Sequence, residues 1–142
     1  MNNYNQNILL AISAQVGLTF IVWCWMYYTR IGTMFRKGIK SQQLEDAATF
    51  DVLLKDVVNP SDNLENLFEM PVLFYAAMIV ILFMGTADVL FGYLAWGFVA
   101  LRVIHSFIHC TSNVINARFT AYFVSSLILW ATWARIGMQL LQ

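Results

Sequence analysis

Residues 66–75, at the edge of a strongly apolar run, carry side chains that could do chemistry. Asn63, Asn66 and Glu69 recur every three residues, so on a helix they share one face. A charged side chain at the bilayer centre costs about 2.5–3.5 kcal/mol on insertion scales unless something pairs with it. Glu69 is therefore a candidate functional group. The alternative is that the three side chains only cap and solvate a helix end.

A second polar stripe follows in the apolar sequence after residue 89. Arg102, His105, His109 and Asn113 are spaced i, i+3, i+7 and i+11, which places them on one helical face. Arginine binds anions by paired hydrogen bonds, and histidine gives or takes a proton near neutral pH. One alternative is an arginine that reaches the membrane surface beside two hydrogen-bonded histidines. Another is a metal site of His105, His109 and Glu69, for which two histidines four residues apart are a weak signal.

The composition predicts that these stripes lie on membrane helices. The chain is 60% hydrophobic and only 11% charged, whereas soluble domains carry about 25% charged residues. Lys, Arg, Asp and Glu are absent from residues 1–29, 70–87, 89–101 and 119–134. A spanning helix needs about 20 mostly apolar residues. We therefore expect an all-α integral membrane four-helix bundle forming a single domain over residues 1–142, with helices at about 8–28, 62–84, 89–109 and 118–141.

The loop between the first two helices, residues 29–61, is the only polar stretch of any size. Residues 44–58 mix charged and apolar side chains, which is typical of an amphipathic helix on the membrane surface. The turn-forming sequence Asn-Pro-Ser-Asp at 59–62 then predicts a helix that starts near Asp62. That start makes Pro71 an interior proline, which should kink the helix just beyond Glu69.

Lys and Arg are distributed unevenly between the predicted loops. All of them except Arg135 either lie in the loop 29–61 or flank the connection between the last two helices: Arg30, Arg36, Lys37, Lys40 and Lys55 in the loop, and Arg102 and Arg118 at the connection. By the positive-inside rule, both loops face the cytoplasm and both termini lie on the other side. The first segment is expected to stay as an anchor, because its leader has no positive charge. Cys24 and Cys110 then lie on the reducing side, where a disulfide is not expected.

Taken in order, these motifs resemble the MAPEG family, the membrane-associated proteins of eicosanoid and glutathione metabolism. The resemblance lies in Asn66-x-x-Glu69 with Pro71 soon after, Arg102-x-x-His105, and Arg118 sixteen residues after Arg102. Length, helix number and loop order also fit. The resemblance implies a homotrimer of four-helix bundles that binds glutathione between subunits near the cytoplasmic surface. For a bacterial-type member it implies the inner membrane.

The resemblance also assigns roles to individual residues. Asn66 and Glu69 match the positions that hold the amino end of glutathione, and Arg102 matches the arginine of the next helix. Arg118 matches the arginine credited with stabilising the thiolate, and Arg30 matches one supplied by a neighbouring subunit.

The sequence departs from the family pattern at two places. Asp62 and Asn63 stand where a basic residue is often found, and His109 replaces a common tyrosine. Asn63 joins the expected binding residues because it shares the face of Asn66. His105 or His109 could donate a hydrogen bond to the sulfur, and we count both with Arg118 as catalytic candidates.

The expected function is a glutathione-dependent transferase or peroxidase that acts on small hydrophobic electrophiles or lipid hydroperoxides. Glutathione is the expected co-substrate, and the expected partners are membrane lipids and further copies of the chain, with no nucleic acid. Two alternatives remain: a non-catalytic membrane scaffold or binding subunit of the same fold, and a metal-binding membrane protein. No motif selects the hydrophobic substrate.

Overall fold

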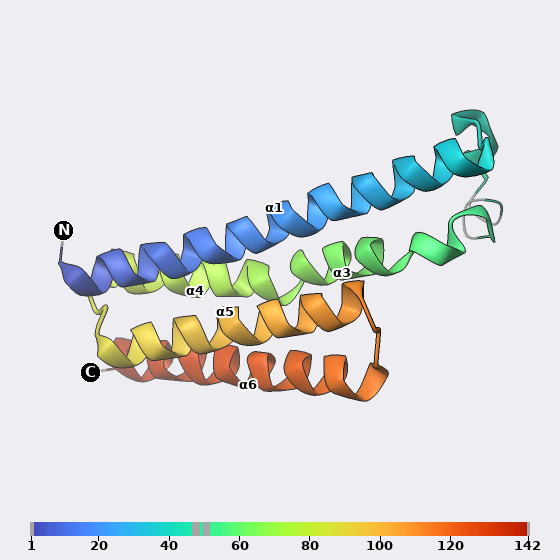
Figure 1. The fold of residues 1–142 in the computed structure, drawn as a ribbon. Helices are drawn as coiled ribbons and strands as arrows, with labels where there is room; N and C mark the ends of the chain where they lie inside the picture. Colours follow the sequence, from blue (N-terminus) through green and yellow to red (C-terminus); the bar gives the residue numbers. More distant parts are fainter. Residues whose placement is uncertain (1, 47–48, 50–51, 142) are drawn as a thin grey trace.

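A computed structural model describes residues 2–46, 49 and 52–141 of the chain, and its regular elements are all helical (Figure 1). This confirms the predicted all-α bundle. The elements in chain order are α1 (Asn3–Lys37), η1 (Ser41–Leu44), η2 (Lys55–Val57), α3 (Asn59–Leu67), α4 (Met70–Met84), α5 (Val89–Cys110) and α6 (Ile115–Leu140). In Figure 1, α1 and α5 run in the same direction, and α4 and α6 run against them.

Helix α1 is longer than the 8–28 segment that the sequence predicted. The Asn2 side chain caps its start by accepting a hydrogen bond from the backbone N of Tyr4, at 2.6 Å. The helix ends at Gly38, whose left-handed backbone (φ 63°) is accessible to glycine at little cost. The charged residues after 28 end the apolar run but do not end the helix. At 1.5 Å per residue its 35 residues extend about 52 Å, beyond a hydrocarbon core of about 30 Å.

The single predicted helix at 62–84 is two helices, α3 and α4, separated at Phe68 and Glu69. Pro71 lies in the first turn of α4. Backbone N–H groups in the first turn have no partner within the helix, so the lack of one in proline costs no hydrogen bond there. The predicted interior kink just beyond Glu69 is therefore wrong, because the helix is already interrupted at Glu69 and restarts. Pro60 similarly opens α3, which begins at Asn59 rather than near Asp62. The surface helix predicted over 44–58 lies partly outside the described residues.

The core forms where α1, α4, α5 and α6 pack together. Buried positions on α1 follow a spacing of three or four residues, which is the pattern of one helix face turned to the core; all are apolar except the fully buried Gln15: Ile8, Ala11, Gln15, Leu18 and Val22. Phe74 of α4 and Phe98 of α5 stack at the centre, with ring centroids 4.6 Å apart. Within the part of the chain that the structure describes, three segments are long and apolar enough to span a membrane: α1, residues 59–84 and α5. The fourth predicted span corresponds to α6, which packs along α5 but is not among these candidates.

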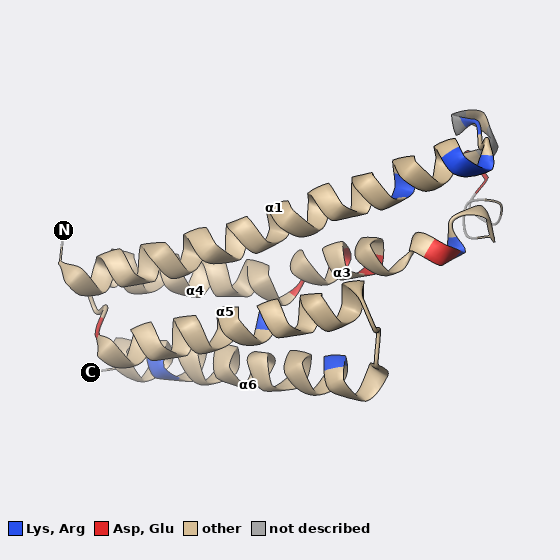
Figure 2. Cartoon of the chain, viewed as in Figure 1, with Lys and Arg blue, Asp and Glu red and all other residues tan. Residues whose placement is uncertain are grey.

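An ion pair joins α5 and α6 at the end of the bundle where both chain termini lie (Figure 2). Asp88 accepts from Arg135 Nη1 at 2.8 Å and pairs with Nη2, and its Oδ1 also caps α5 through the backbone N of Phe91. The Arg135 guanidinium lies 4.0 Å from the Phe91 ring centroid. The hydrogen bond from Arg135 lowers the pKa of Asp88 to about 2, so the carboxylate stays ionised well into the acidic range.

At the opposite end, α1 projects past α5 and α6, and blue Lys and Arg segments gather there in Figure 2. Lys37 Nζ lies 2.8 Å from Asp56 Oδ2 and donates to the backbone oxygen of Leu53. These contacts attach the end of α1 to the segment that precedes α3. The hydrogen bond from Lys37 lowers the pKa of the exposed Asp56 carboxyl.

Candidate functional site

Arg102 is completely buried at the junction of α3, α5 and α6. Its Nη2 donates to the backbone oxygen of Asn66 at 2.7 Å, and its guanidinium carbon lies 5.2 Å from the Tyr122 ring centroid. Its Nε and Nη1 have no hydrogen-bond partner. A buried charge with unpaired donors is costly, and such a group is retained where a partner completes it. The two unpaired nitrogens leave this guanidinium with unused capacity to donate to an accepting group.

His105, one turn further along α5, has a defined tautomer. Its Nδ1 lies 2.9 Å from the backbone oxygen of Arg118. A carbonyl only accepts, so we infer that Nδ1 carries the proton and that Nε2 of the neutral ring presents a lone pair. Nε2 is buried and has no partner. His105 thus offers a proton acceptor beside Arg102.

His109 extends this set of unpaired nitrogens by one further turn. It is 2% exposed, and neither of its ring nitrogens has a hydrogen-bond partner. Its ring packs edge-on against that of His105, with centroids 5.4 Å apart. We call Arg102, His105 and His109 the α5 cluster. The helical spacing predicted this shared face, and the structure places the three residues in the protein interior.

Tyr122 of α6 is a site residue that the sequence pattern did not single out. Its hydroxyl donates to Glu69 Oε2 at 3.4 Å, and its ring lies against Arg102 and against His105, 5.6 Å away. It thus connects the exposed carboxylate of Glu69 to the α5 cluster. Its position four residues after Arg118 puts both on one face of α6, which is the signal that would have found it.

The two predicted asparagines have different environments. Asn63 is fully buried, accepts from Ser106 Oγ at 3.2 Å and donates to Cys110 Sγ at 3.4 Å. These bonds commit its side chain to holding α3 on α5. Asn66 contributes its backbone oxygen to Arg102, and its side chain donates to the backbone oxygen of Asp62. The structure therefore brings Asn66, more than Asn63, to the α5 cluster.

Arg118 and Arg30 are both held by contacts within the chain. Arg118 Nη1 donates to Asn113 Oδ1 at 2.7 Å, and Asn113 donates in turn to Asn59 Oδ1 at 3.0 Å. This chain of bonds fixes the α5–α6 connection against the start of α3. Arg30 Nη2 donates to Ser61 Oγ at 2.9 Å, so in a single subunit it lies against α3.

The arrangement combines Arg102, a histidine with one unpaired ring nitrogen and, through Tyr122, an exposed carboxylate. Arg118 adjoins this set through its backbone oxygen, which His105 contacts, while its side chain is bonded to Asn113. This set suits a small ligand that carries both negative and positive groups and a dissociable proton. Among the described residues, no group of three or more His, Cys, Asp or Glu side chains lies close enough together to hold a metal ion. The alternative of a site built from His105, His109 and Glu69 therefore lacks support.

Comparison with known proteins agrees with this class of membrane helical bundle. The MAPEG family matches residues 8–138, nearly the whole chain, and the chain belongs to that family. The resemblance found in the motifs is thereby confirmed. The family is membrane-embedded and includes glutathione transferases and peroxidases as well as non-catalytic members. No curated protein and no solved structure matches the chain.

Proposed function

We propose that this protein is a membrane-bound glutathione-dependent transferase or peroxidase that activates the glutathione thiol at the α5 cluster. The observation that carries the proposal is the set of five buried nitrogens without partners: Nε and Nη1 of Arg102, Nε2 of His105, and both ring nitrogens of His109. Unpaired buried polar groups are rare in folded proteins and call for an explanation. A ligand that accepts from Arg102 and gives a proton to His105 explains several of them together.

Glutathione offers the groups that this site needs. It carries two carboxylates, one ammonium group and one thiol. Arg102 and Arg118 are suited to its negative groups, because a guanidinium forms paired, charge-assisted hydrogen bonds. Glu69, exposed and oriented by Tyr122, is suited to the ammonium group. We assign Asn66 to positioning, because its backbone oxygen holds Arg102.

The chemistry begins with loss of the thiol proton. A free thiol has a pKa of about 8.5, and lowering it by two units requires about 2.7 kcal/mol of differential stabilisation. Arg118 and Arg102 would supply this by favouring the negative sulfur, and His105 Nε2 would pass the thiol proton on to water rather than keep it. In transfer, the thiolate forms a bond to an electrophilic carbon, and the leaving group departs with its electron pair. In reduction, the thiolate attacks the terminal oxygen of a lipid hydroperoxide and the O–O bond breaks, which releases the alcohol and leaves glutathione as its sulfenic acid. A second glutathione then displaces the sulfenic oxygen as water and forms the disulfide.

Binding of glutathione to the purified protein is the direct test. We expect a saturable isotherm, accompanied by thiolate absorbance that appears only when glutathione is bound. S-methylglutathione serves as the control, because it should compete for the site without producing thiolate absorbance. Binding without thiolate formation would favour the non-catalytic alternative. Absence of binding would refute the proposal.

For the assembly we propose a homotrimer in a bacterial inner membrane, with the loop predicted at 29–61 in the cytoplasm and both termini on the other side. The basic end of α1 supports the orientation, and membership of the family supports the trimer. Native mass spectrometry in mild detergent should report three copies, and monomers alone would count against it. Reporter fusions at Lys40 and at the C-terminus should report opposite sides of the membrane. The same side for both would refute the orientation.

A further inference from the structure

His109 is a buried titratable group that the proposed mechanism does not use. It lies in the last turn of α5, which ends at Cys110, and it is 2% exposed. Neither Nδ1 nor Nε2 of its ring has a hydrogen-bond partner. Such groups are rare because their desolvation is not offset, and an apolar side chain would fill the same space without that cost. The ring therefore calls for a functional explanation.

His105 cannot keep a proton that it accepts, and only one of its nitrogens can release it. Its Nδ1 hydrogen is held by the backbone oxygen of Arg118, which only accepts, so both uptake and release must use Nε2. Nε2 is buried away from solvent. The guanidinium of Arg102, one turn earlier on the same face, disfavours a lasting positive charge on the ring. A proton taken up by His105 therefore needs a carrier that leads to water.

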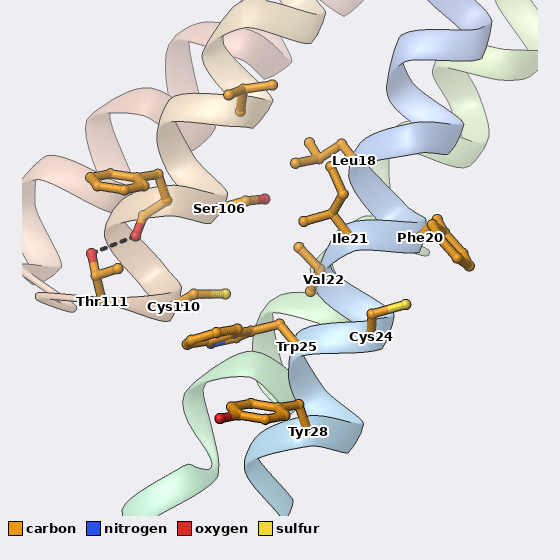
Figure 3. Close-up of a pocket in the computed structure, with 12 residues that line it drawn as sticks. Leu18, Phe20, Ile21, Val22, Cys24, Trp25, Tyr28, Ser106, Cys110 and Thr111 are labelled. Carbon is orange, nitrogen blue, oxygen red and sulfur yellow. Dashed lines mark hydrogen bonds between the residues drawn. The ribbon is translucent and has the colours of Figure 1, made fainter.

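The packing around α5 makes His109 the candidate carrier. Its ring lies edge-on against that of His105, with centroids 5.4 Å apart, and it is one turn nearer to the exposed Thr111 at the end of the helix. The side of α5 that faces α1 offers no such path. Ser106 and Cys110 point to that side in Figure 3, into a pocket whose lining is largely apolar and includes no histidine.

The two histidines are held in opposite ways, and this difference suits a relay. The bond to Arg118 fixes the tautomer of His105, so this ring works from one nitrogen only. At His109 no hydrogen bond fixes either the tautomer or the orientation of the ring. An imidazole in this state can accept a proton on one nitrogen and release one from the other, which is the behaviour of a proton shuttle.

We propose that His109 relays protons between His105 and the water at the end of α5. The inference rests on the proposed function, which supplies the proton. The S–H bond of the thiol breaks with its electron pair left on sulfur, and the proton binds His105 Nε2. It then passes, through one intervening water molecule, to the free ring nitrogen of His109, which releases a proton to water at the helix end. Rotation about the side-chain bonds of His109 presents a free nitrogen to His105 again. Both histidines end neutral, and His109 acts through His105 without touching the thiol.

Stopped-flow mixing of the full chain with glutathione tests this inference, with thiolate absorbance and a pH-indicator dye as the two signals. In the wild type we expect the dye to report a released proton in step with thiolate formation. His109→Phe should slow both signals about tenfold, which corresponds to a barrier higher by about 1.4 kcal/mol. The glutathione Kd and the final thiolate absorbance should stay unchanged, because a relay alters the rate of proton transfer and not its equilibrium.

Two further variants separate proton transfer from structure. His109→Gln keeps polar atoms but does not titrate, so it should be as slow as His109→Phe. His109→Ala leaves a space, and imidazole added to the buffer should restore the rate in this variant and not in His109→Phe. Ser106→Ala is the matched control, because Ser106 lies on α5, is equally buried and is bonded to Asn63, but carries no titratable group. Its rate should equal that of the wild type.

Wild-type rates in His109→Phe and His109→Gln would overturn the relay. Equal slowing in Ser106→Ala, or a failure of imidazole to restore His109→Ala, would do so as well. Weaker glutathione binding in the His109 variants would also overturn it, because His109 would then be a contact of the ligand. If the wild type itself forms no thiolate, the proposed function fails and the relay fails with it. A wild type that forms thiolate beside unaffected variants refutes the relay alone.

Discussion

Arg102→Met is expected to abolish glutathione binding while leaving the unliganded protein at least as stable as the wild type. The wild-type guanidinium is fully buried and has one hydrogen bond, to Asn66, and two unpaired nitrogens. Replacing buried ionic groups by apolar ones of similar volume is often neutral or stabilising. At a glutathione concentration one hundred times the Kd, the wild type should gain about 2.7 kcal/mol of stability. The variant should gain none. Thermal unfolding with and without glutathione measures both effects.

Arg135→Met is the matched control for this experiment, since it makes the same substitution in an arginine with a structural role. Arg135 pairs with Asp88 and packs on Phe91, outside the α5 cluster. Its loss should lower the stability of the unliganded protein by about 1 kcal/mol or less, because the pair is partly exposed. The gain on adding glutathione should remain. If Arg102→Met retains that gain, or if it unfolds the protein more than Arg135→Met does, then Arg102 is structural.

Arg118→Ala is expected to raise the pKa of the bound glutathione thiol and to slow the reaction, with glutathione affinity within about tenfold of wild type. Other groups hold the charged ends of glutathione, so the loss should fall on the thiolate. The rate should drop about tenfold for each 1.4 kcal/mol of stabilisation that is lost. A pH series of thiolate absorbance, together with single-turnover rates, measures the pKa and the chemical step separately. Arg118→Lys should restore activity only in part, because lysine lacks the planar fork.

Glu69→Gln should show the opposite pattern, and it is the control for Arg118→Ala. Glu69 is assigned to the ammonium group of glutathione and has no part in the proposed proton transfer. Its change should therefore weaken binding while sparing the single-turnover rate of the glutathione that remains bound. If Arg118→Ala leaves both the thiol pKa and the rate unchanged, its assigned role is wrong. His105→Gln would then be the variant expected to produce those changes, since His105 Nε2 presents the free lone pair.

The sequence determined the class of this protein and the part of its candidate site that lies on α5. Apolar runs without charge predict membrane helices because burying charge in hydrocarbon is costly wherever it occurs. The α5 cluster was predictable for a similar reason. Helical geometry alone puts residues spaced three and four apart on one face, whatever packs against them. The motifs of Asn66, Glu69, Arg102 and Arg118 were enough to indicate the family, because their types and order can be recognised without any knowledge of how the helices pack.

The contacts that other helices make with the α5 cluster depend on which helices pack together, and a pattern within one helix does not contain that information. Tyr122 became part of the site because α6 packs on α5 beside Arg102. Asn63 shares a face with Asn66, yet its side chain is hydrogen-bonded to Ser106 and Cys110 and so holds α3 on α5. Arg135, a lone cation in the sequence, pairs with Asp88, which is distant in the chain. Contacts between separate helices decided each of these, because hydrogen bonds in a buried interface form only between groups that packing brings together.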